Sequence, residues 1–373
     1  MKETINEIQD LRKSKVIAYI TGDRTPINAS IAEDVVRPMY EHLLKIGNQN
    51  KIDLFLYSRG GDVSVPWRIV SMIREFCKEF SVLIPYKAHS AATLLSLGAD
   101  NIFMCKKAEF GPIDPTLKKL NSDTAGPPME VSVEDVNSYI SFIRDKANIN
   151  DQSSLSNMVG ILANHLNPLT LGKVNRQNSH IRLVARKLLT SRNEKADEAK
   201  ISSIIETLTE KIYSHGHAIG RAEASEIGLP VRSTKLDLED KLWTLFTKYE
   251  SFLDINNPLD PQLILENIDE KKFENLPIAV IESEKLSHKF AVKLEFKKKR
   301  QIPNNPQFNI NLNLNMPPNV PPDQLPQQLQ QNLQGILNSF TPQIQKLVND
   351  ELKKQSPEIG IDVKAFGGKW DLY

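Results

Sequence analysis

Ser90 and the pair Gly60-Gly61 are the strongest candidates for catalytic residues in this sequence. Each follows an apolar run that ends at small residues, and each precedes a stretch that predicts a helix. A serine hydroxyl can act as a nucleophile, and glycine leaves backbone N–H groups open to a ligand. Together they offer the two parts that acyl transfer by serine requires, a nucleophile and donors for the developing oxyanion.

The structural alternatives are a helix cap at Ser90 and a plain turn at Gly60-Gly61. Two features favour chemistry at Ser90. Small residues follow it, so a substrate carbonyl could approach closely, and the start of a helix would supply oriented N–H groups. The amides of Gly61 and Ala91 are then the predicted oxyanion donors. Ser96 is a rival hydroxyl, but it lies within the predicted helix, where serine bonds back to the preceding turn.

Alternating elements would position these residues. Apolar runs predict buried strands at residues 15–20, 52–57, 81–84 and 101–105. Helical spacing of apolar residues predicts helices at residues 31–46, 65–80 and 91–99. This alternation favours an α/β core with parallel strands.

The middle of the chain is predicted to be largely helical. This region covers residues 132–213, and Pro168 and Gly172 are expected to interrupt it. Two further helices are predicted at residues 222–227 and 236–253, the first ending at a glycine.

The last third of the chain differs in composition. Its predicted features are strands at 278–281 and 290–296, a basic run at 297–300, an Asn/Pro/Gln-rich segment at 303–332 and a helix at 335–352. We therefore predict one domain at residues 1–253 and an accessory region at residues 254–373 that combines β-strands, the Asn/Pro/Gln-rich segment and a C-terminal helix.

Charge and motif content argue against nucleic acid and ATP as ligands of this chain. The 373 residues carry a net charge of +1 and a sequence pI near 7.7, which argues against a broad footprint for nucleic acid. No Gly-Lys-Ser or Gly-Lys-Thr tripeptide forms a phosphate loop, so ATP hydrolysis by this chain is not expected. The basic run at 297–300 is read as the solvated end of a strand.

The compartment is also suggested by composition. The two cysteines, Cys77 and Cys105, do not make a disulfide framework, which favours a reducing, cytoplasmic location. The N-terminus lacks the order of a secretory signal, and no apolar run approaches the ~18 residues of a membrane span. We therefore expect no integral membrane segment.

Five motifs in a fixed order resemble those of a known family. The chain is similar to the serine dehydrogenase proteinase family, which belongs with the Clp- and crotonase-like serine peptidases and is related to signal peptide peptidase A. The resemblance covers about residues 12 to 253. The matching segments are 58–63, 88–94, 110–115, 167–172 and 223–229. It implies an α/β fold with a Clp/crotonase-like core of repeated strand-strand-helix units, a helical extension and a small C-terminal accessory region.

The resemblance also implies roles for single residues. Ser90 lies where the family has its nucleophile, and Gly61 and Ala91 lie where it has its oxyanion donors. A peptide would lie extended beside the turn at Gly60-Gly61, which makes Gly60 and Asp62 candidate substrate-binding residues.

The general base is the least determined part of the resemblance. Clp peptidases have a histidine in the strand after the nucleophile helix, whereas this chain has Asp114 there, before a proline that also suits a simple turn. Clp peptidases have their acid near the position of His215 here. An exchange of the two roles gives the triad Ser90, His215 and Asp114, because triads recur with different chain orders. Lys87 is the alternative base, as in the Ser/Lys dyad of signal peptide peptidase A relatives.

The predicted function is that of a serine endopeptidase acting on peptides or proteins as a homo-oligomer. A Clp-like scaffold without activity, which binds a protein partner through its C-terminal region, is one alternative, and crotonase-like acyl-CoA chemistry is another. No metal or other cofactor is expected, because His215 and His217 lack the third protein ligand of a catalytic zinc site.

Overall fold

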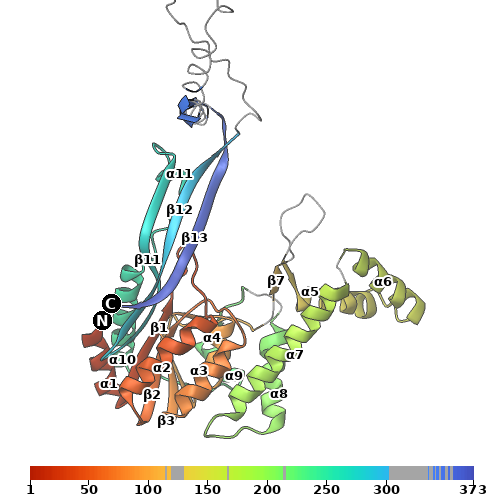
Figure 1. Ribbon diagram of the computed structural model, residues 1–373. Coiled ribbons are helices and arrows are strands. Elements are labelled where there is room, and N and C mark those ends of the chain that lie inside the picture. The colour runs from red at the N-terminus through yellow and green to blue at the C-terminus, as the bar shows by residue number, and fades with distance from the viewer. Residues whose placement is uncertain are drawn as a thin grey trace, which may run out of the picture. The chain divides into compact units, whose positions relative to one another are not determined.

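The structure is a computed structural model. It describes residues 1–113, 116–118, 130–165, 168–212, 216–301 and 356–373, and in addition 335, 339–340, 342–343, 346–348 and 352. An eight-stranded sheet with the order β10-β5-β3-β2-β1-β11-β12-β13 organises these residues (Figure 1).

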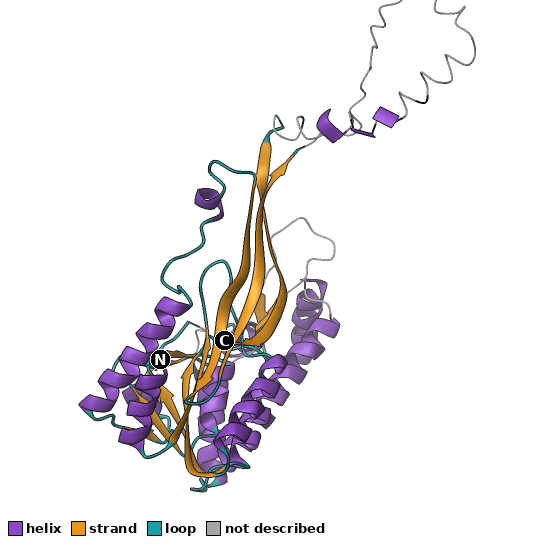
Figure 2. Ribbon diagram, turned by 60° about the vertical axis from the view of Figure 1, so that its left-hand side comes forward, coloured by secondary structure: helices purple, strands orange, loops and turns teal. Residues whose placement is uncertain are grey.

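The strands nearest the candidate residues run parallel. They are β1 (Lys15–Thr21), β2 (Gln49–Tyr57), β3 (Cys77–Ile84), β5 (Asn101–Met104) and β10 (Val231–Arg232). After its first residue β1 is buried on both faces, as a parallel strand is when helices cover both sides of the sheet. Figure 2 shows helices on both sides of these strands. The predicted α/β core with parallel strands is confirmed.

The helices form two groups, and the helices within each group pack together. On one side α1 (Lys2–Arg12) contacts α10 (Leu236–Phe252). The other group consists of α2 (Val36–Ile46), α3 (Val65–Arg74), α4 (Ala91–Leu97) and α7 (Pro168–Thr190), each of which contacts at least one of the others. The short 3-10 helix η1 (Glu33–Val35) leads into α2. The turns that carry Gly60-Gly61 and Ser90 therefore precede helices that pack together.

Two small sheets and a helical part make up the rest of this region of the chain. Three short strands, β4 (Lys87–Ala88), β6 (Glu109–Phe110) and β9 (Ile219–Gly220), form a separate sheet, and β7 (Thr116–Lys118) pairs with β8 (Glu130–Ser132). The helical part consists of α5 (Val133–Ser141), the π-helix η2 (Phe142–Lys146), α6 (Gln152–His165), α7, α8 (Glu198–Glu206), the π-helix η3 (Thr207–Lys211) and α9 (Arg221–Glu226).

Two predicted boundaries are wrong. The helix predicted at 65–80 ends at Arg74, and β3 begins at Cys77, because Cys77 and Phe80 pair in register with Gln49 and Ile52 of β2. Pairing in the sheet overrides the helical spacing of the local apolar residues.

The predicted interruption at Gly172 is also wrong. The helix α7 starts at Pro168, where the fixed φ of proline suits a first helical residue, and it continues through Gly172. A single glycine within a 23-residue helix lowers its stability without ending it.

The C-terminal strands are longer than the sequence suggests. Strand β11 (Glu270–Ser283) runs antiparallel to β1, and β12 (Ser287–Arg300) and β13 (Glu358–Leu372) follow it in the sheet. The strand β13 was not predicted. The short helix α11 (Pro261–Ile264) precedes β11. The Asn/Pro/Gln-rich segment at 303–332 lies outside the described residues, as does most of the predicted helix at 335–352.

The chain divides into two compact units. The first comprises Met1–Leu259, Asn275–Lys293 and Gly367–Tyr373, and the second comprises Asp260–Glu274 and Leu294–Phe366. The division into functional domains at residues 1–253 and 254–373 stays a prediction. Across the part of the chain that the structure describes, no helix has the length and apolar character needed to cross a membrane.

A chain of buried polar side chains ties α2 to the hairpin of β11 and β12. Nδ1 of His42 lies 2.8 Å from Oγ of Ser283, and Nε2 of His42 lies 3.1 Å from Nδ1 of His288. Nε2 of His288 lies 3.2 Å from a carboxylate oxygen of Glu41. Every contact is satisfied when Ser283 donates to a neutral His42, His42 donates to His288 and His288 donates to Glu41. Burial, together with the neighbouring His288, lowers the pKa of His42 to about 3.

This burial predicts a loss of stability in acid. An unfolded histidine titrates near pH 6.5, so the contribution of neutral His42 is complete above that pH and falls as the pH approaches about 3. Between pH 7 and pH 5 the free energy of unfolding should fall by about 2 kcal/mol through this group. Urea denaturation should show a shallower pH dependence for His42→Gln. The exposed His217→Gln is the matched control, and equal slopes for wild type and His42→Gln would contradict the prediction.

Candidate active site

Ser90 occupies a strained turn between β4 and α4. Its φ is 50° and its ψ is −113°, a conformation that residues other than glycine rarely adopt. Its hydroxyl does not cap α4, although Ser90 is the residue that precedes this helix. The helix-cap alternative therefore does not account for the serine. Backbone strain of this kind, at a partly buried serine, is an observation that points to function.

The turn at Gly60-Gly61 packs directly against Ser90. A Cβ atom placed on Gly60 would lie 2.8 Å from Cβ of Ser90 and 2.8 Å from the carbonyl oxygen of His89. A Cβ atom on Gly61 would lie 2.1 Å from the carbonyl oxygen of Ile31. The φ angles are +110° at Gly60 and +152° at Gly61. Both close approach and conformation require glycine at these positions.

Backbone pairing fixes this turn from two sides. The N–H of Ser58 donates to the carbonyl of Lys87 at 3.0 Å, and the N–H of His89 donates to the carbonyl of Ser58 at 2.9 Å. On the other side, the N–H of Ile31 donates to the carbonyl of Gly60 and the N–H of Asp62 donates to the carbonyl of Ile31, both at 2.8 Å. The glycine turn is thus held in register between two segments.

The amides of the turn point in different directions. The N–H of Gly60 donates to Oγ of Ser58 at 3.0 Å, and the same oxygen accepts the hydroxyl of Thr21 at 2.7 Å. Ser58 and Thr21 are buried, so this pair fixes the peptide between Arg59 and Gly60. The N–H groups of Gly61 and Ala91 have no hydrogen-bond partner among the described residues. Their role as oxyanion donors stays a prediction.

Lys87 contacts a carboxylate that it shares with two other residues. Its Nζ lies 3.7 Å from Oδ2 of Asp23 and 4.6 Å from the centre of the Tyr86 ring. The same Asp23 accepts the hydroxyl of Tyr57 at 2.8 Å and pairs with Nε of Arg59 at 2.8 Å. Asp23 thus contacts the charged side chains of Lys87 and Arg59 as well as the hydroxyl of Tyr57.

His89 pairs with Glu109 of the neighbouring strand. The distance from its Nε2 to Oε1 of Glu109 is 3.1 Å. Burial lowers the pKa of His89 in spite of this carboxylate. A Cβ atom on Gly111 would lie 3.1 Å from Cβ of His89, so the glycine makes room for this side chain. The imidazole is thus a packed, paired group beside the nucleophile.

The other predicted site residues are placed as follows. Asp62 is exposed, and its Oδ1 accepts the N–H of Ser64 at 2.8 Å. Ser96 is buried and its hydroxyl donates to the carbonyl of Ala92 at 2.8 Å, as its position within a helix predicts. Asp114 and His215 lie outside the described residues, so their part in a triad stays a prediction.

Asp23, Ser58 and Thr21 were not singled out from the sequence. The signal that could have found them is their position, because each lies at or just after the carboxyl end of β1 or β2. Ligands of parallel sheets bind at that edge. Among the described residues, no group of three His, Cys, Asp or Glu side chains is arranged to hold a metal ion.

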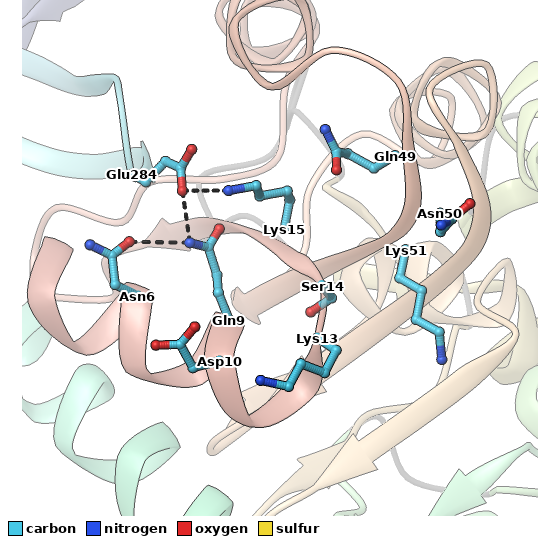
Figure 3. Close-up of a pocket in the computed structure, with 10 residues that line it drawn as sticks. All are labelled: Asn6, Gln9, Asp10, Lys13, Ser14, Lys15, Gln49, Asn50, Lys51 and Glu284. Carbon is cyan, nitrogen blue, oxygen red and sulfur yellow. Dashed lines mark hydrogen bonds and ion pairs between the residues drawn. The ribbon is translucent and has the colours of Figure 1, made fainter.

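A cavity of about 570 Å³ opens at the other edge of the sheet, near the amino ends of β1 and β2 (Figure 3). Glu284 accepts hydrogen bonds there from Gln9 at 2.9 Å and from Lys15 at 2.7 Å. Ser90 does not line this cavity. The cavity and the nucleophile are therefore separate features of the fold.

Comparison with known proteins agrees with the predicted resemblance. Residues 1–126 match the family model described as ClpP-like SDH-type serine proteinase, which confirms the resemblance to the serine dehydrogenase proteinase family over that part of the chain. This segment contains Ser90, Gly61 and Ala91.

Two curated proteins of Methanocaldococcus jannaschii are similar, and both are uncharacterized. MJ0137 is 25% identical over 66% of this chain and 77% of its own length. MJ1495 is 29% identical over 30% of this chain and 41% of its own length.

Two solved structures are similar to this chain. One is a mutant of the membrane-bound stomatin-specific protease 1510-N, with 16% identity, a TM-score of 0.34, and coverage of 60% of this chain and 83% of that chain. The other is ClpP1 from Listeria monocytogenes, with 14% identity, a TM-score of 0.32, and coverage of 62% and 98%.

The glycine turn predicts a sharp contrast between two Gly→Ala substitutions. Gly61→Ala should destabilise the protein by at least about 2 kcal/mol, because its φ is +152° and the new Cβ meets backbone. Gly172→Ala, with nothing within 4 Å and a helical backbone, should be neutral or stabilising by up to about 1 kcal/mol. Chemical denaturation measures both. Equal stability of the two variants would refute the close approach at Gly61.

Proposed function

We propose that the chain is a serine peptidase that cleaves peptide bonds through Ser90. The observation that carries the proposal is the strained, partly buried Ser90, with the N–H groups of Gly61 and Ala91 unpaired among the described residues in the two turns that meet there. The match of residues 1–126 to a ClpP-like serine proteinase family supports the same chemistry.

In this mechanism the Ser90 hydroxyl attacks the carbonyl carbon of the scissile peptide. The carbonyl oxygen gains negative charge, and the N–H groups of Gly61 and Ala91 stabilise it. Such donors act without reorganising, because the backbone that carries them is already fixed, and removal of one donor costs about 100- to 1,000-fold in rate in known enzymes. Here the peptide that carries the N–H of Gly61 is fixed through its carbonyl, that of Gly60, which accepts the N–H of Ile31 at 2.8 Å.

The C–N bond then breaks, the general base returns the serine proton to the leaving amine, and the acyl group stays on Ser90 as an ester. A water molecule that the base deprotonates hydrolyses this ester, which releases the acid and restores the Ser90 hydroxyl.

For the proton transfer we propose His215 as general base, oriented by Asp114. The support is their position in the sequence: Asp114 lies within the family segment 110–115, and His215 lies shortly before the segment 223–229, near where Clp peptidases have their acid. The alternative base, Lys87, contacts Oδ2 of Asp23 at 3.7 Å, so its ammonium group already has a carboxylate partner.

The substrate would be a peptide in extended conformation at the turn. The carbonyl of Gly60 and the N–H of Asp62 are already paired with Ile31, which leaves Gly61 as the backbone donor for a ligand. Gly60 then contributes by its lack of a side chain, and Asp62 by its exposed carboxylate. We further propose a cytoplasmic homo-oligomer that acts on peptide or protein substrates.

The proposal predicts the outcome of covalent labelling by a fluorophosphonate. The wild-type protein should be labelled at Ser90, and Ser90→Ala should show no labelling because the nucleophile is absent. Ser96→Ala is the matched control, since its hydroxyl only bonds back within α4, and it should label like wild type. Mass spectrometry of the labelled peptide identifies the site. Unchanged labelling of Ser90→Ala would overturn the proposed function.

A second set of variants tests the base. His215→Gln should lower the labelling rate about 100-fold or more, which is the usual contribution of general base catalysis. Lys87→Met should lower it less than about tenfold, because Lys87 acts only as a charged neighbour. His217→Gln, two residues after His215, controls for the loss of an imidazole. The reverse order of effects for His215 and Lys87 would assign the base to the lysine.

A further inference from the structure

Arg59 is held beside the candidate nucleophile by a carboxylate. Its Nε lies 2.8 Å from Oδ2 of Asp23, and the side chain of Asp23 is only 9% exposed. Asp23 is itself fixed by the hydroxyl of Tyr57 and by Lys87. Because Asp23 is held by three partners, it limits the positions that the Arg59 guanidinium can take.

The position of Arg59 follows from its neighbours in the chain. It directly precedes Gly60, whose backbone is in contact with Ser90. It also follows Ser58, which pairs with the strand that leads to Ser90. The charge of Arg59 acts on the imidazole of His89, the residue before the nucleophile. Arg59 therefore belongs to the segment that packs against the turn of Ser90.

The free part of Arg59 faces solvent. Its side chain is 56% exposed, and its guanidinium donates no hydrogen bond to another described residue beyond the ion pair with Asp23. A guanidinium carries five N–H donors in a fixed plane, and contact through Nε leaves the two terminal nitrogens for a second partner.

The nearby carboxylates already have other partners. Glu109 contacts His89, Asp62 accepts the N–H of Ser64, and Asp23 is shared as described above. The exposed donors of Arg59 are thus matched by no carboxylate of the described chain, and they suit a carboxylate supplied by a ligand.

We infer that Arg59 binds a carboxylate of the peptide substrate, which makes the site selective for a peptide with an acidic group next to the cleaved bond. The inference rests on the proposed function of Ser90. The carboxylate comes either from an Asp or Glu side chain or from the C-terminus of a short peptide, and the chemistry of recognition is the same for both.

The first experiment uses two peptidyl diphenyl phosphonates that differ only in Glu against Gln at the residue bearing the phosphorus. The wild type should react about tenfold faster with the Glu probe, and Arg59→Gln should react equally with both. Arg59→Lys should keep part of the preference, because the positive charge remains. Arg37→Gln, a change of the same type at an exposed arginine on α2, is the matched control and should keep the full preference.

The second experiment distinguishes the source of the carboxylate. Peptides of one sequence with a free or an amidated C-terminus compete with an uncharged fluorophosphonate for Ser90. Stronger protection by the free acid, lost in Arg59→Gln, assigns the site to the C-terminal carboxylate, and a Glu preference without this difference assigns it to an acidic side chain.

Failure of the inference and failure of the proposed function give different results. If the wild type shows neither a Glu preference nor stronger protection by the free acid, or if Arg59→Gln keeps the preference it shows, the role of Arg59 is overturned while labelling of Ser90 persists. If no probe labels Ser90 in the folded wild type, the proposed function falls and the inference falls with it.

Discussion

The close contact between two backbone turns is the constraint on which the rest of the site depends. One turn carries Gly60-Gly61 and the other carries Ser90, and no side chain fits between them. The contact places the unpaired amides of Gly61 and Ala91 in adjoining turns beside one hydroxyl. It exists because β2 and the strand before Ser90 are held in register by the bonds between Ser58 and its neighbours. The strain at Ser90 is tolerated because the packing around both turns determines it.

Polar side chains near the turns orient the backbone amide of Gly60 and the charged groups around Asp23. The hydroxyl of Ser58 accepts the N–H of Gly60 and is itself held by the hydroxyl of Thr21. The N–H of the next residue, Gly61, has no partner among the described residues. Asp23 contacts Tyr57 and Arg59 at the carboxyl ends of β1 and β2, and it contacts Lys87 at the start of β4. A buried carboxylate is stable only with such partners, so the same interactions that satisfy Asp23 also orient the charged groups beside the nucleophile.

The candidate nucleophile and oxyanion donors could be recognised from the sequence because small residues and glycine pairs mark places where backbone must be approached closely. Their geometry could not, since it depends on strand register and on a φ of 50° at a serine. Lys87 was an alternative base in the sequence, and the fold brings it into contact with Asp23, 64 positions earlier in the chain. No local pattern reports such a contact.

The sequence by itself determined the class of the fold, because apolar runs that alternate with helical spacing leave few arrangements other than a parallel sheet covered by helices. It also marked Ser90 and the glycine pair. Only the tertiary structure decided where α3 ends and β3 begins, and whether β13 joins the sheet. Strand pairing sets both the boundary and the sheet membership, and the local spacing of apolar residues does not report it. The partners of Asp23, Ser58 and His42 were likewise decided by the fold, because hydrogen bonds between distant residues form only after the elements have packed.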